Sequence, residues 1–461
     1  MYTKKAHIHF IGIGGIGMSG IAHILRHQGY TISGCDTDTH RKNIESLKNI
    51  GCSIYKGNNT QKCNDDSIDI LVYSSAISVQ NPEIIAAQKR DIPTISRALM
   101  LAELMRTKYS IAIAGSHGKT TTTSLVSHIL IESQFDPTVI IGGHLINMSS
   151  NARIGNGDFL VAEADESDRS FLHLQATLAL VTNIDLEHLE TYAHLQDVKE
   201  TYIRFLNNLP FYGKAFVCID DPNIQSILPL PHIKLIKYGL SEQASVSAKN
   251  ITLHDNHSTF TVTQDNEPLG PITLHMPGEH NILNCLGAIA ICNDIGVPFN
   301  AIQKAMLNFK GIERRFWFRG TYQGAEIFDD YAHHPKEVYH TLKVARKRTK
   351  NKLTVIFQPH RYSRTHHLWN DFLNVFSDNS IDRLIITDIY AASETPINGV
   401  SSKEFVQALQ RMNPRLTISY VPYDDQFNQL QHALNGQLEQ DDLLLLLGAG
   451  KLTYFPTVIS S

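Results

Sequence analysis

The stretch IAIAGSHGKTTTT, from Ile111 to Thr123, has the residue types of a loop that binds nucleotide phosphates. Glycines let backbone N–H groups approach phosphate oxygens, Lys119 neutralises their charge, and the hydroxyl of Thr120 can bind Mg²⁺. The usual spacing has a glycine where this chain has Ile113, so the predicted loop is two residues tighter. The residues that we predict to bind the phosphates of a nucleotide here are Gly115, Ser116, His117, Gly118, Lys119, Thr120 and Thr121.

A second glycine-rich loop lies near the start of the chain, where Gly12, Gly14 and Gly17 form the pattern G-x-G-x-x-G. Asp36 follows after a second apolar stretch, at the distance from which a carboxylate can accept from a ribose hydroxyl. Such a loop binds a pyrophosphate, which both a nicotinamide dinucleotide and a UDP-linked substrate carry. Two phosphate loops in one chain predict two phosphorylated ligands.

Polar residues follow two further apolar stretches. Glu163 ends the strand pattern of FLVAE, and His188 lies in TNIDLEHLETY, just after another strand pattern. Because the carboxyl ends of parallel strands face one crevice, both side chains are expected near the bound phosphates. We predict Thr120, Glu163 and His188 as metal ligands; the oxygen ligands favour Mg²⁺, and the histidine would also accept Mn²⁺.

The elements that position these residues alternate between strand and helix patterns along most of the 461 residues. This alternation predicts an α/β protein with mainly parallel sheets. New strand patterns begin at three places, so we expect three domains, over residues 1–108, 109–312 and 313–461.

Composition excludes several classes of protein. The formal net charge of −4 does not favour a nucleic-acid partner, and the apolar runs are too short for a membrane span. The six cysteines are scattered without ligand spacing, which is typical of a reduced protein without structural zinc. We therefore expect a cytoplasmic protein with small-molecule substrates, no nucleic-acid partner and no membrane insertion.

The motifs in their order resemble those of the Mur ligases, which form amide bonds with ATP during peptidoglycan precursor synthesis. The resemblance covers nearly the whole chain through GIGGIGMSGIA, YSSAI, RALMLAELMR, AGSHGKTTTT, AEADESDRSFLHL, TNIDLEHLETY, FLNNLPFYG, GEHNILN, DDYAHHPKEV and FQPHRYSRT. It is greatest to the members that join L-alanine to UDP-N-acetylmuramate. It implies a Rossmann-like N-terminal domain, a central domain similar to P-loop ATPases, and a Rossmann-like C-terminal domain.

The resemblance also implies a reaction. The lactyl carboxylate of UDP-N-acetylmuramate would attack the γ-phosphorus of ATP, and the amine of L-alanine would then attack the acyl phosphate. The expected catalytic residues are Lys119, Glu163, His188 and His333. ATP and Mg²⁺, with Mn²⁺ as an alternative ion, are the expected cofactors, and we expect a monomer or a homodimer.

Binding residues carry over from the family motif by motif. The UDP-sugar would contact Gly12, Gly14, Gly15, Gly17, Asp36, Ser74 and Ser75. Further ATP contacts would be Asn281, Arg314, Asp330 and Tyr331. L-Alanine would contact His333, Arg361 and Arg364, and two guanidinium groups near one carboxylate would leave the amine free to attack.

The chain departs from the family pattern at YKGNNTQKC, which lacks a Gly-His pair, at Glu279, and at GAGKLTYF near its end. Tyr202 or Ile203 falls where sister ligases carry a carbamylated lysine, so we expect none here. Three alternatives stay open: a ligase that recycles a tripeptide onto the same nucleotide sugar, an NAD-dependent dehydrogenase, and a nucleotide-binding protein without catalysis.

Overall fold

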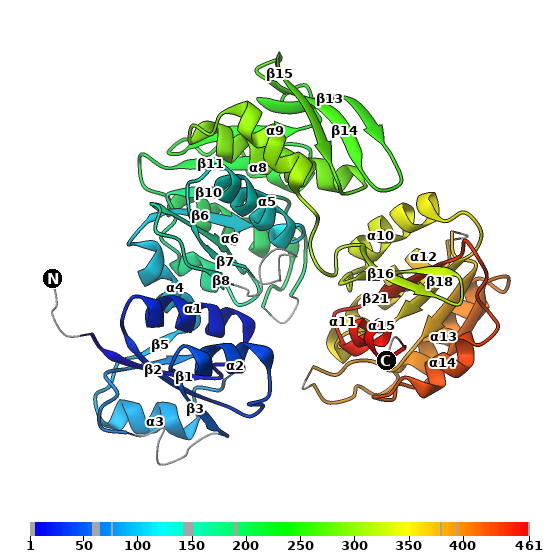
Figure 1. Cartoon of the computed structure of the whole chain (residues 1–461), viewed down its shortest axis with the longest axis horizontal. Coiled ribbons are helices and arrows are strands. Elements are labelled where there is room, and N and C mark those ends of the chain that lie inside the picture. The colour runs from blue at the N-terminus through cyan, green and yellow to red at the C-terminus, as the bar shows by residue number, and fades with distance from the viewer. Residues whose placement is uncertain are drawn as a thin grey trace. The chain divides into compact units, whose positions relative to one another are not determined.

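The computed structural model describes residues 5–57, 65–74, 77–141, 152–188, 191–378, 380–392 and 394–459. Strands and helices alternate through these residues and form three separate sheets, so the predicted α/β class is confirmed (Figure 1). The chain divides into two compact units. The first holds residues 1–252, 258–275 and 279–310, and the second holds residues 253–257, 276–278 and 311–461.

The N-terminal sheet of the first unit has five parallel strands, and the chain enters it in the middle. The order is β3 (Ser53–Lys56), β2 (Thr31–Asp36), β1 (His7–Ile11), β4 (Ile70–Tyr73) and β5 (Thr94–Ser96). Successive strands extend from β1 to one side and then to the other, and the carboxyl end of the strand where the order reverses is where such sheets generally bind ligands. The helices are α1 (Ile16–His27), α2 (Lys42–Asn49), α3 (Pro82–Lys89) and α4 (Arg97–Met105).

The central sheet has ten strands, and its middle is parallel. Strand β6 (Tyr109–Ala114) lies between β10 (Leu178–Val181) and β9 (Phe159–Glu163). These strands are nearly continuous apolar runs because helices cover both faces of a parallel sheet. The other strands are β7 (Thr138–Ile140), β8 (Ala152–Arg153), β11 (Lys214–Cys218), β12 (Lys234–Gly239), β13 (Val246–Leu253), β14 (Ser258–Gln264) and β15 (Glu267–Leu274).

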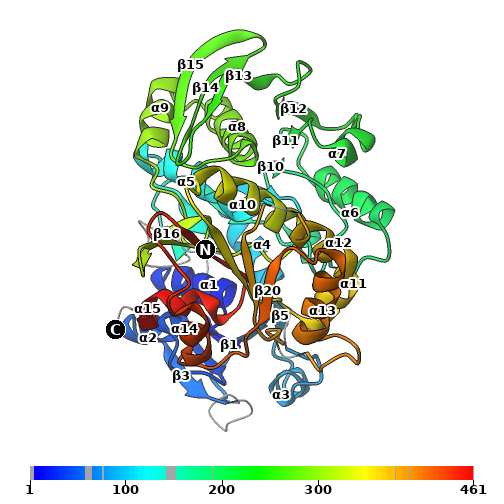
Figure 2. The same ribbon diagram turned by 90° about the vertical axis from the view of Figure 1, so that its right-hand side faces the viewer.

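Helices α5 (Lys119–Glu132) and α8 (Glu279–Asp294) pack against each other and against the central strands. Helix α8 is buried around most of its circumference, as its apolar sequence predicts. Helix α9 (Phe299–Asn308) packs on β15, and Figure 2 shows it beside the strands β13 to β15. The remaining helices of this part are η2 (Ser170–His173), α6 (Leu195–Asn207) and α7 (Pro222–Ser226).

The second unit contains a six-stranded sheet in the order β16 (Trp317–Tyr322), β17 (Ala325–Asp330), β21 (Leu443–Leu447), β18 (Leu353–Phe357), β19 (Arg383–Ile386) and β20 (Thr417–Tyr420). Among the described residues of this sheet, only β16 is antiparallel to its neighbour. Its helices are α10 (Pro335–Arg348), α11 (Tyr362–His367), α12 (Trp369–Phe376), α13 (Ser402–Met412), α14 (Asn428–Leu434), η3 (Lys451–Tyr454) and α15 (Phe455–Ile459).

The leucine run of β21 contributes side chains to the hydrophobic clusters on both faces of this sheet. Leu443, Leu445 and Leu447 lie in one buried cluster, whereas Leu444 and Leu446 lie in the cluster on the other face. Alternate residues of a strand point to opposite faces, so a run of five leucines is suited to a strand in the middle of a covered sheet. No helix among the described residues is long and apolar enough to cross a membrane.

Candidate active site

The N-terminal glycine loop connects β1 to α1 at the predicted crevice. Gly12 has a φ of +76°, and a Cβ there would lie 3.7 Å from Cβ of Ser74, which follows β4. The N–H of Gly14 donates to Oδ2 of Asp36 at 2.9 Å. Asp36 is buried and also accepts from the N–H of Asp38, so its carboxylate supports the loop. Ser75, predicted beside Ser74, lies outside the described residues.

Arg97, which sequence analysis did not assign to the site, lies against the third glycine of this loop. A Cβ on Gly17 would lie 3.1 Å from Nη1 of Arg97. The other end of the guanidinium, Nη2, lies 3.6 Å from Oδ2 of Asp165, in the segment that follows β9. Arg97 therefore joins the glycine loop to the central sheet, within the first unit.

The central phosphate loop, residues 115–118, connects β6 to α5 and can be formed only with its two glycines. Gly115 has a φ of +131°, and a Cβ there would lie 1.9 Å from Oγ1 of Thr182. Gly118 has a φ of +81°, and a Cβ there would lie 2.4 Å from Oδ1 of Asn284. Real Cβ atoms do not approach other atoms so closely, and side chains disfavour positive φ.

The tightness of the loop is explained by its attachment to the segment that follows β10. The N–H of Ser116 donates to the carbonyl of Asn183 at 3.1 Å. The side chain of Asn183 accepts from the N–H of His117 and donates to its carbonyl, at 2.9 and 3.0 Å. Thr182 Oγ1 also donates to that carbonyl, at 2.6 Å. The usual phosphate loop has two more residues at this turn. Here these contacts hold the shorter backbone in place.

Lys119 begins α5 and turns back over the phosphate loop. Its Nζ donates to the carbonyls of Gly115 and Ser116, at 2.5 and 3.0 Å, and to Oε1 of Glu166 at 2.9 Å. Burial alone would lower the pKa of Lys119, but Glu166 and then other carboxylates outweigh it and raise the pKa to about 12. The lysine therefore stays charged in the physiological pH range.

Carboxylates and imidazoles surround this lysine. Glu166, Glu187 and His188 form a group whose ligand atoms lie within 4.8 Å of one another. Nε2 of His188 lies 3.7 Å from Glu166 and 3.8 Å from Glu187. His117 lies between Oδ2 of Asp185 and Oε1 of Glu187, at 3.4 and 3.5 Å. Neither Glu166 nor Glu187 was predicted as a site residue, although both follow strand ends beside the phosphate loop.

One observation, besides the composition of the group, indicates that Glu166, Glu187 and His188 are suited to a divalent cation. Glu166 is 2% exposed, and its Oε2 has no hydrogen-bond partner within the described part of the chain. A buried carboxylate oxygen in that state is suited to a cation. His188 belongs to this group, whereas Glu163 ends β9 and is not part of any such group among the described residues.

Asn281 lies in the first turn of α8 and is buried. Asn284, one turn further along the helix, accepts from Oγ1 of Thr122 at 3.3 Å and lies against Gly118. Residues three apart share one face of a helix, so Asn281 and Asn284 are on the face that meets α5. Asn284 was missed because the sequence carries no signal for a contact with a residue more than 160 positions away.

In the second unit, Arg314, Asp330 and Tyr331 lie together at the end of β17. The guanidinium of Arg314 lies 4.7 Å from the centroid of the Tyr331 ring and donates to the carbonyl of Gly448 at 2.6 Å. The buried carboxylate of Asp330 accepts from the N–H groups of Phe316 and Ala332, at 2.7 and 2.8 Å. Burial raises the pKa of Asp330 to about 6.

A cationic cluster surrounds His360 after β18. Nη1 of Arg364 lies 3.0 Å from Nδ1 of His360, and the rings of His333 and His360 lie 5.8 Å apart. Burial, as the largest cause, and then His333, Arg364, Arg361 and Arg314 in that order together lower the pKa of His360 to about 3. The neutral His360 ring can therefore accept a hydrogen bond from Arg364. The three residues predicted to contact the amino acid all lie near His360, which was not itself predicted as a site residue.

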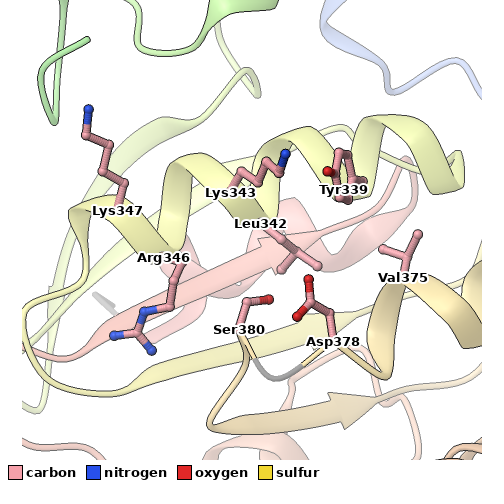
Figure 3. Close-up of a pocket in the computed structure, with 8 residues that line it drawn as sticks. All are labelled: Tyr339, Leu342, Lys343, Arg346, Lys347, Val375, Asp378 and Ser380. Carbon is pink, nitrogen blue, oxygen red and sulfur yellow. The ribbon is translucent and has the colours of Figure 1, made fainter.

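A separate groove of about 300 Å³ lies along α10 in the second unit, lined by Tyr339, Leu342, Lys343, Arg346, Lys347, Val375, Asp378 and Ser380 (Figure 3). Its cations already have local partners. Lys343 lies 4.3 Å from the centroid of the Tyr339 ring, and Arg346 lies 2.7 Å from Asp382. The groove contains no residue predicted for the active site, so it is not part of it.

Comparisons with protein families agree with the resemblance seen in the motifs. Three models match consecutive ranges: "Mur ligase family, catalytic domain" matches residues 7–109, "Mur ligase middle domain" matches 113–292, and "Mur ligase, glutamate ligase domain" matches 314–450.

Individual relatives match the chain from end to end. A UDP-N-acetylmuramate–L-alanine ligase of Desulfotalea psychrophila is 46% identical, over 98% of this chain and 97% of the relative. One of Syntrophotalea carbinolica is 45% identical over the same shares. Among solved structures, a UDP-N-acetylmuramate–alanine ligase from Thermotoga maritima is 25% identical and has a TM-score of 0.81, over 98% of this chain and 97% of that one. A murein peptide ligase from Psychrobacter arcticus has a TM-score of 0.71 at 22% identity and shares the fold.

Proposed function

The chain belongs to the Mur ligase family, and we propose that it joins L-alanine to the lactyl carboxylate of UDP-N-acetylmuramate with ATP, in peptidoglycan precursor synthesis. The products would be UDP-N-acetylmuramoyl-L-alanine, ADP and phosphate. The observation that carries this proposal is the charged Lys119 in its phosphate loop, with Glu166, Glu187 and His188 beside it. A lysine and side chains that can bind a metal ion, placed beside a phosphate loop, are the parts that phosphoryl transfer uses.

The chemistry of amide-bond formation explains why ATP is needed. A carboxylate does not condense with an amine in water at a useful rate, so it must first receive a leaving group. The lactyl oxygen attacks the γ-phosphorus, and ADP departs. The neutral amine of L-alanine then attacks the carbonyl carbon of the acyl phosphate, and the tetrahedral intermediate expels inorganic phosphate. In our proposal, Lys119 and the loop N–H groups stabilise the oxygens of the transferred phosphoryl group.

We propose a division of labour among three domains, over residues 1–108, 109–312 and 313–461. The first domain binds the UDP-sugar, with Gly12, Gly14, Gly15, Gly17, Asp36, Ser74 and Ser75 as the proposed contacts. ATP contacts the central phosphate loop, Asn281, and Arg314, Asp330 and Tyr331. Arg361 and Arg364 bind the carboxylate of L-alanine, with His333 beside them, which leaves the amine free to attack.

A divalent cation, Mg²⁺ or Mn²⁺, completes the proposal. The sequence predicts Thr120, Glu163 and His188 as its ligands, and we add Glu166 and Glu187, which lie in one group with His188. When bound, the cation neutralises phosphate charge. We further propose a cytoplasmic location and a monomer or homodimer.

One assay tests the reaction and its amino acid together. Inorganic phosphate is measured with ATP, Mg²⁺ and UDP-N-acetylmuramate, and either L-alanine or the tripeptide is then added. We expect release that requires L-alanine. Release with the tripeptide alone would indicate the recycling ligase, and no release with either would refute both ligases. A dehydrogenase would instead change the absorbance of a nicotinamide cofactor.

A further inference from the structure

Lys119 has no free N–H to offer a phosphate in this structure. An ammonium group has three donors, and here they go to the carbonyls of Gly115 and Ser116 and to Oε1 of Glu166. The two carbonyls belong to the loop that the lysine closes. The carboxylate of Glu166 is therefore the acceptor that an incoming phosphate oxygen would replace, one anion for another.

Releasing Lys119 would leave Glu166 in an unfavourable state. The side chain is 2% exposed, and its Oε2 already lacks a hydrogen-bond partner among the described residues. The carboxylates of Asp165 and Glu187 lie close enough to raise the pKa of Glu166, in addition to the larger effect of burial. The pKa of Glu166 is about 7 with Lys119 beside it, so a Glu166 that loses the lysine must gain either a proton or another cation, because an uncompensated buried charge is strongly destabilising.

A replacement cation has a place beside the same oxygen. Nε2 of His188 lies 3.7 Å from Oε1 of Glu166, and Glu187 completes the group. The hydroxyl of Tyr202 is fully buried nearby, and burial together with Glu166 raises its pKa well above the ordinary value. Tyr202 therefore keeps its proton and adds no competing charge.

We propose that Glu166 exchanges Lys119 for the divalent cation that accompanies the nucleotide, so that it holds the lysine before ATP binds and the cation afterwards. The inference deepens the proposed function and rests on it for the identity of the nucleotide. It makes Glu166 a positioning residue for Lys119 and a metal ligand. It also predicts that Lys119 blocks the cation site until a phosphate draws the lysine away.

The test uses Mn²⁺ alone, without nucleotide, because free Mn²⁺ is measured directly by its electron paramagnetic resonance signal. Lys119→Met should expose Glu166 and bind Mn²⁺ at least tenfold more tightly than the wild-type protein. The double variant Lys119→Met/Glu166→Gln should return to the wild-type value. The proposal is overturned if Lys119→Met binds Mn²⁺ no more tightly than the wild type, or if the double variant retains the gain.

A second measurement does not depend on whether the Lys119→Met variant folds. Glu166→Gln keeps the shape and one acceptor oxygen but removes the charge, so ADP in the presence of EDTA should bind about tenfold more tightly by calorimetry. Added Mg²⁺ should then improve ADP binding less than it does in the wild type. Equal weakening of ADP binding with and without Mg²⁺ would indicate a merely structural role and would contradict the exchange.

The matched control is Glu132→Gln, the same change at the far end of α5. Glu132 is exposed and lies 13 residues from Lys119, about 20 Å along the helix. It should leave both Mn²⁺ and ADP binding unchanged. Because none of these measurements uses UDP-N-acetylmuramate or L-alanine, a failed ligase assay on the wild type would refute the proposed reaction without touching the exchange.

Discussion

The N–H of Gly14 and the carboxylate of Asp36 are joined by a hydrogen bond of 2.9 Å, which ties the N-terminal glycine loop to the end of the neighbouring strand β2. A Cβ on Gly14 would lie 2.9 Å from the same carboxylate oxygen. The close approach of the two residues is therefore possible only with a glycine at position 14. The acid predicted to accept from a ribose therefore also holds the loop that would receive the pyrophosphate.

Asp36→Asn should weaken UDP-N-acetylmuramate binding about tenfold, because the amide has one acceptor oxygen for two N–H donors. ATP binding should not change, since the central phosphate loop is built on other strands. Calorimetry with each ligand separates the two effects. If both ligands bound equally less well, the substitution would be acting on the fold and the assignment to the UDP-sugar would be wrong.

Lys119→Ala should lower phosphate release by at least about 100-fold, because it removes the cation that stabilises the transferred phosphoryl group. Binding of UDP-N-acetylmuramate, measured by calorimetry, should stay within about twofold of the wild type. Loss of that binding would contradict the proposed division between the two glycine loops. Lys119→Arg is the matched charge-retaining variant, and we expect it to recover little activity because the bulkier guanidinium does not fit between the two loop carbonyls and Glu166.

Gly115→Ala should abolish ATP binding and destabilise the first unit by about 1–3 kcal/mol, because the new Cβ would lie 1.9 Å from Oγ1 of Thr182. Gly296→Ala is the control in the same unit. Gly296 also has a positive φ, of +90°, but its Cβ would meet nothing within 4 Å. It should cost about 1 kcal/mol and leave ATP binding intact. Denaturant unfolding and ATP calorimetry on both variants make the comparison.

Arg361→Ala should raise the KM for L-alanine about 10- to 100-fold, the cost of losing a charge-assisted contact with a carboxylate. The KM for ATP should change by less than about threefold. Arg346→Ala removes an arginine of the α10 groove and should affect neither constant. An equal rise in both KM values for Arg361→Ala would place that arginine elsewhere than at the amino acid.

His360 should make the second unit less stable in acid. The pKa of His360 is lowered from 6.5 to about 3 by burial and by the surrounding cations, so between these values the unfolded chain binds more protons than the folded one. Stability then falls as the pH falls, by up to about 2 kcal/mol between pH 7 and pH 5 from this residue.

The measurement is urea unfolding followed by tryptophan fluorescence, because both tryptophans, Trp317 and Trp369, lie in the second unit. His360→Gln keeps an acceptor for Arg364 and cannot be protonated. The stability difference between wild type and variant should therefore shrink or reverse on acidification. Curves that run parallel from pH 7 to pH 5 would show that His360 does not contribute this dependence.

Predictions from the sequence succeeded where the signal is local. The glycine spacing, the apolar strand before Gly115 and the apolar helix after Lys119 together predict a phosphate loop between a strand and a helix, and β6 and α5 flank it in the structure. The alternation of patterns predicted the α/β class for the same reason, since periodicity follows from local backbone geometry. The role of His188 as a metal ligand, expected from its place after a strand, stays a prediction.

The sequence by itself thus determined the family, the α/β class and the residue types available for phosphate and carboxylate binding. Only the tertiary structure decided which side chain takes which partner. Glu166 pairs with Lys119, Asn284 contacts Gly118 from a distant helix, and His360 lies close to Arg361 and Arg364. The physical reason is that such contacts join residues tens to hundreds of positions apart, and their partners are selected by the order of strands in a sheet and by close packing, which no local pattern encodes.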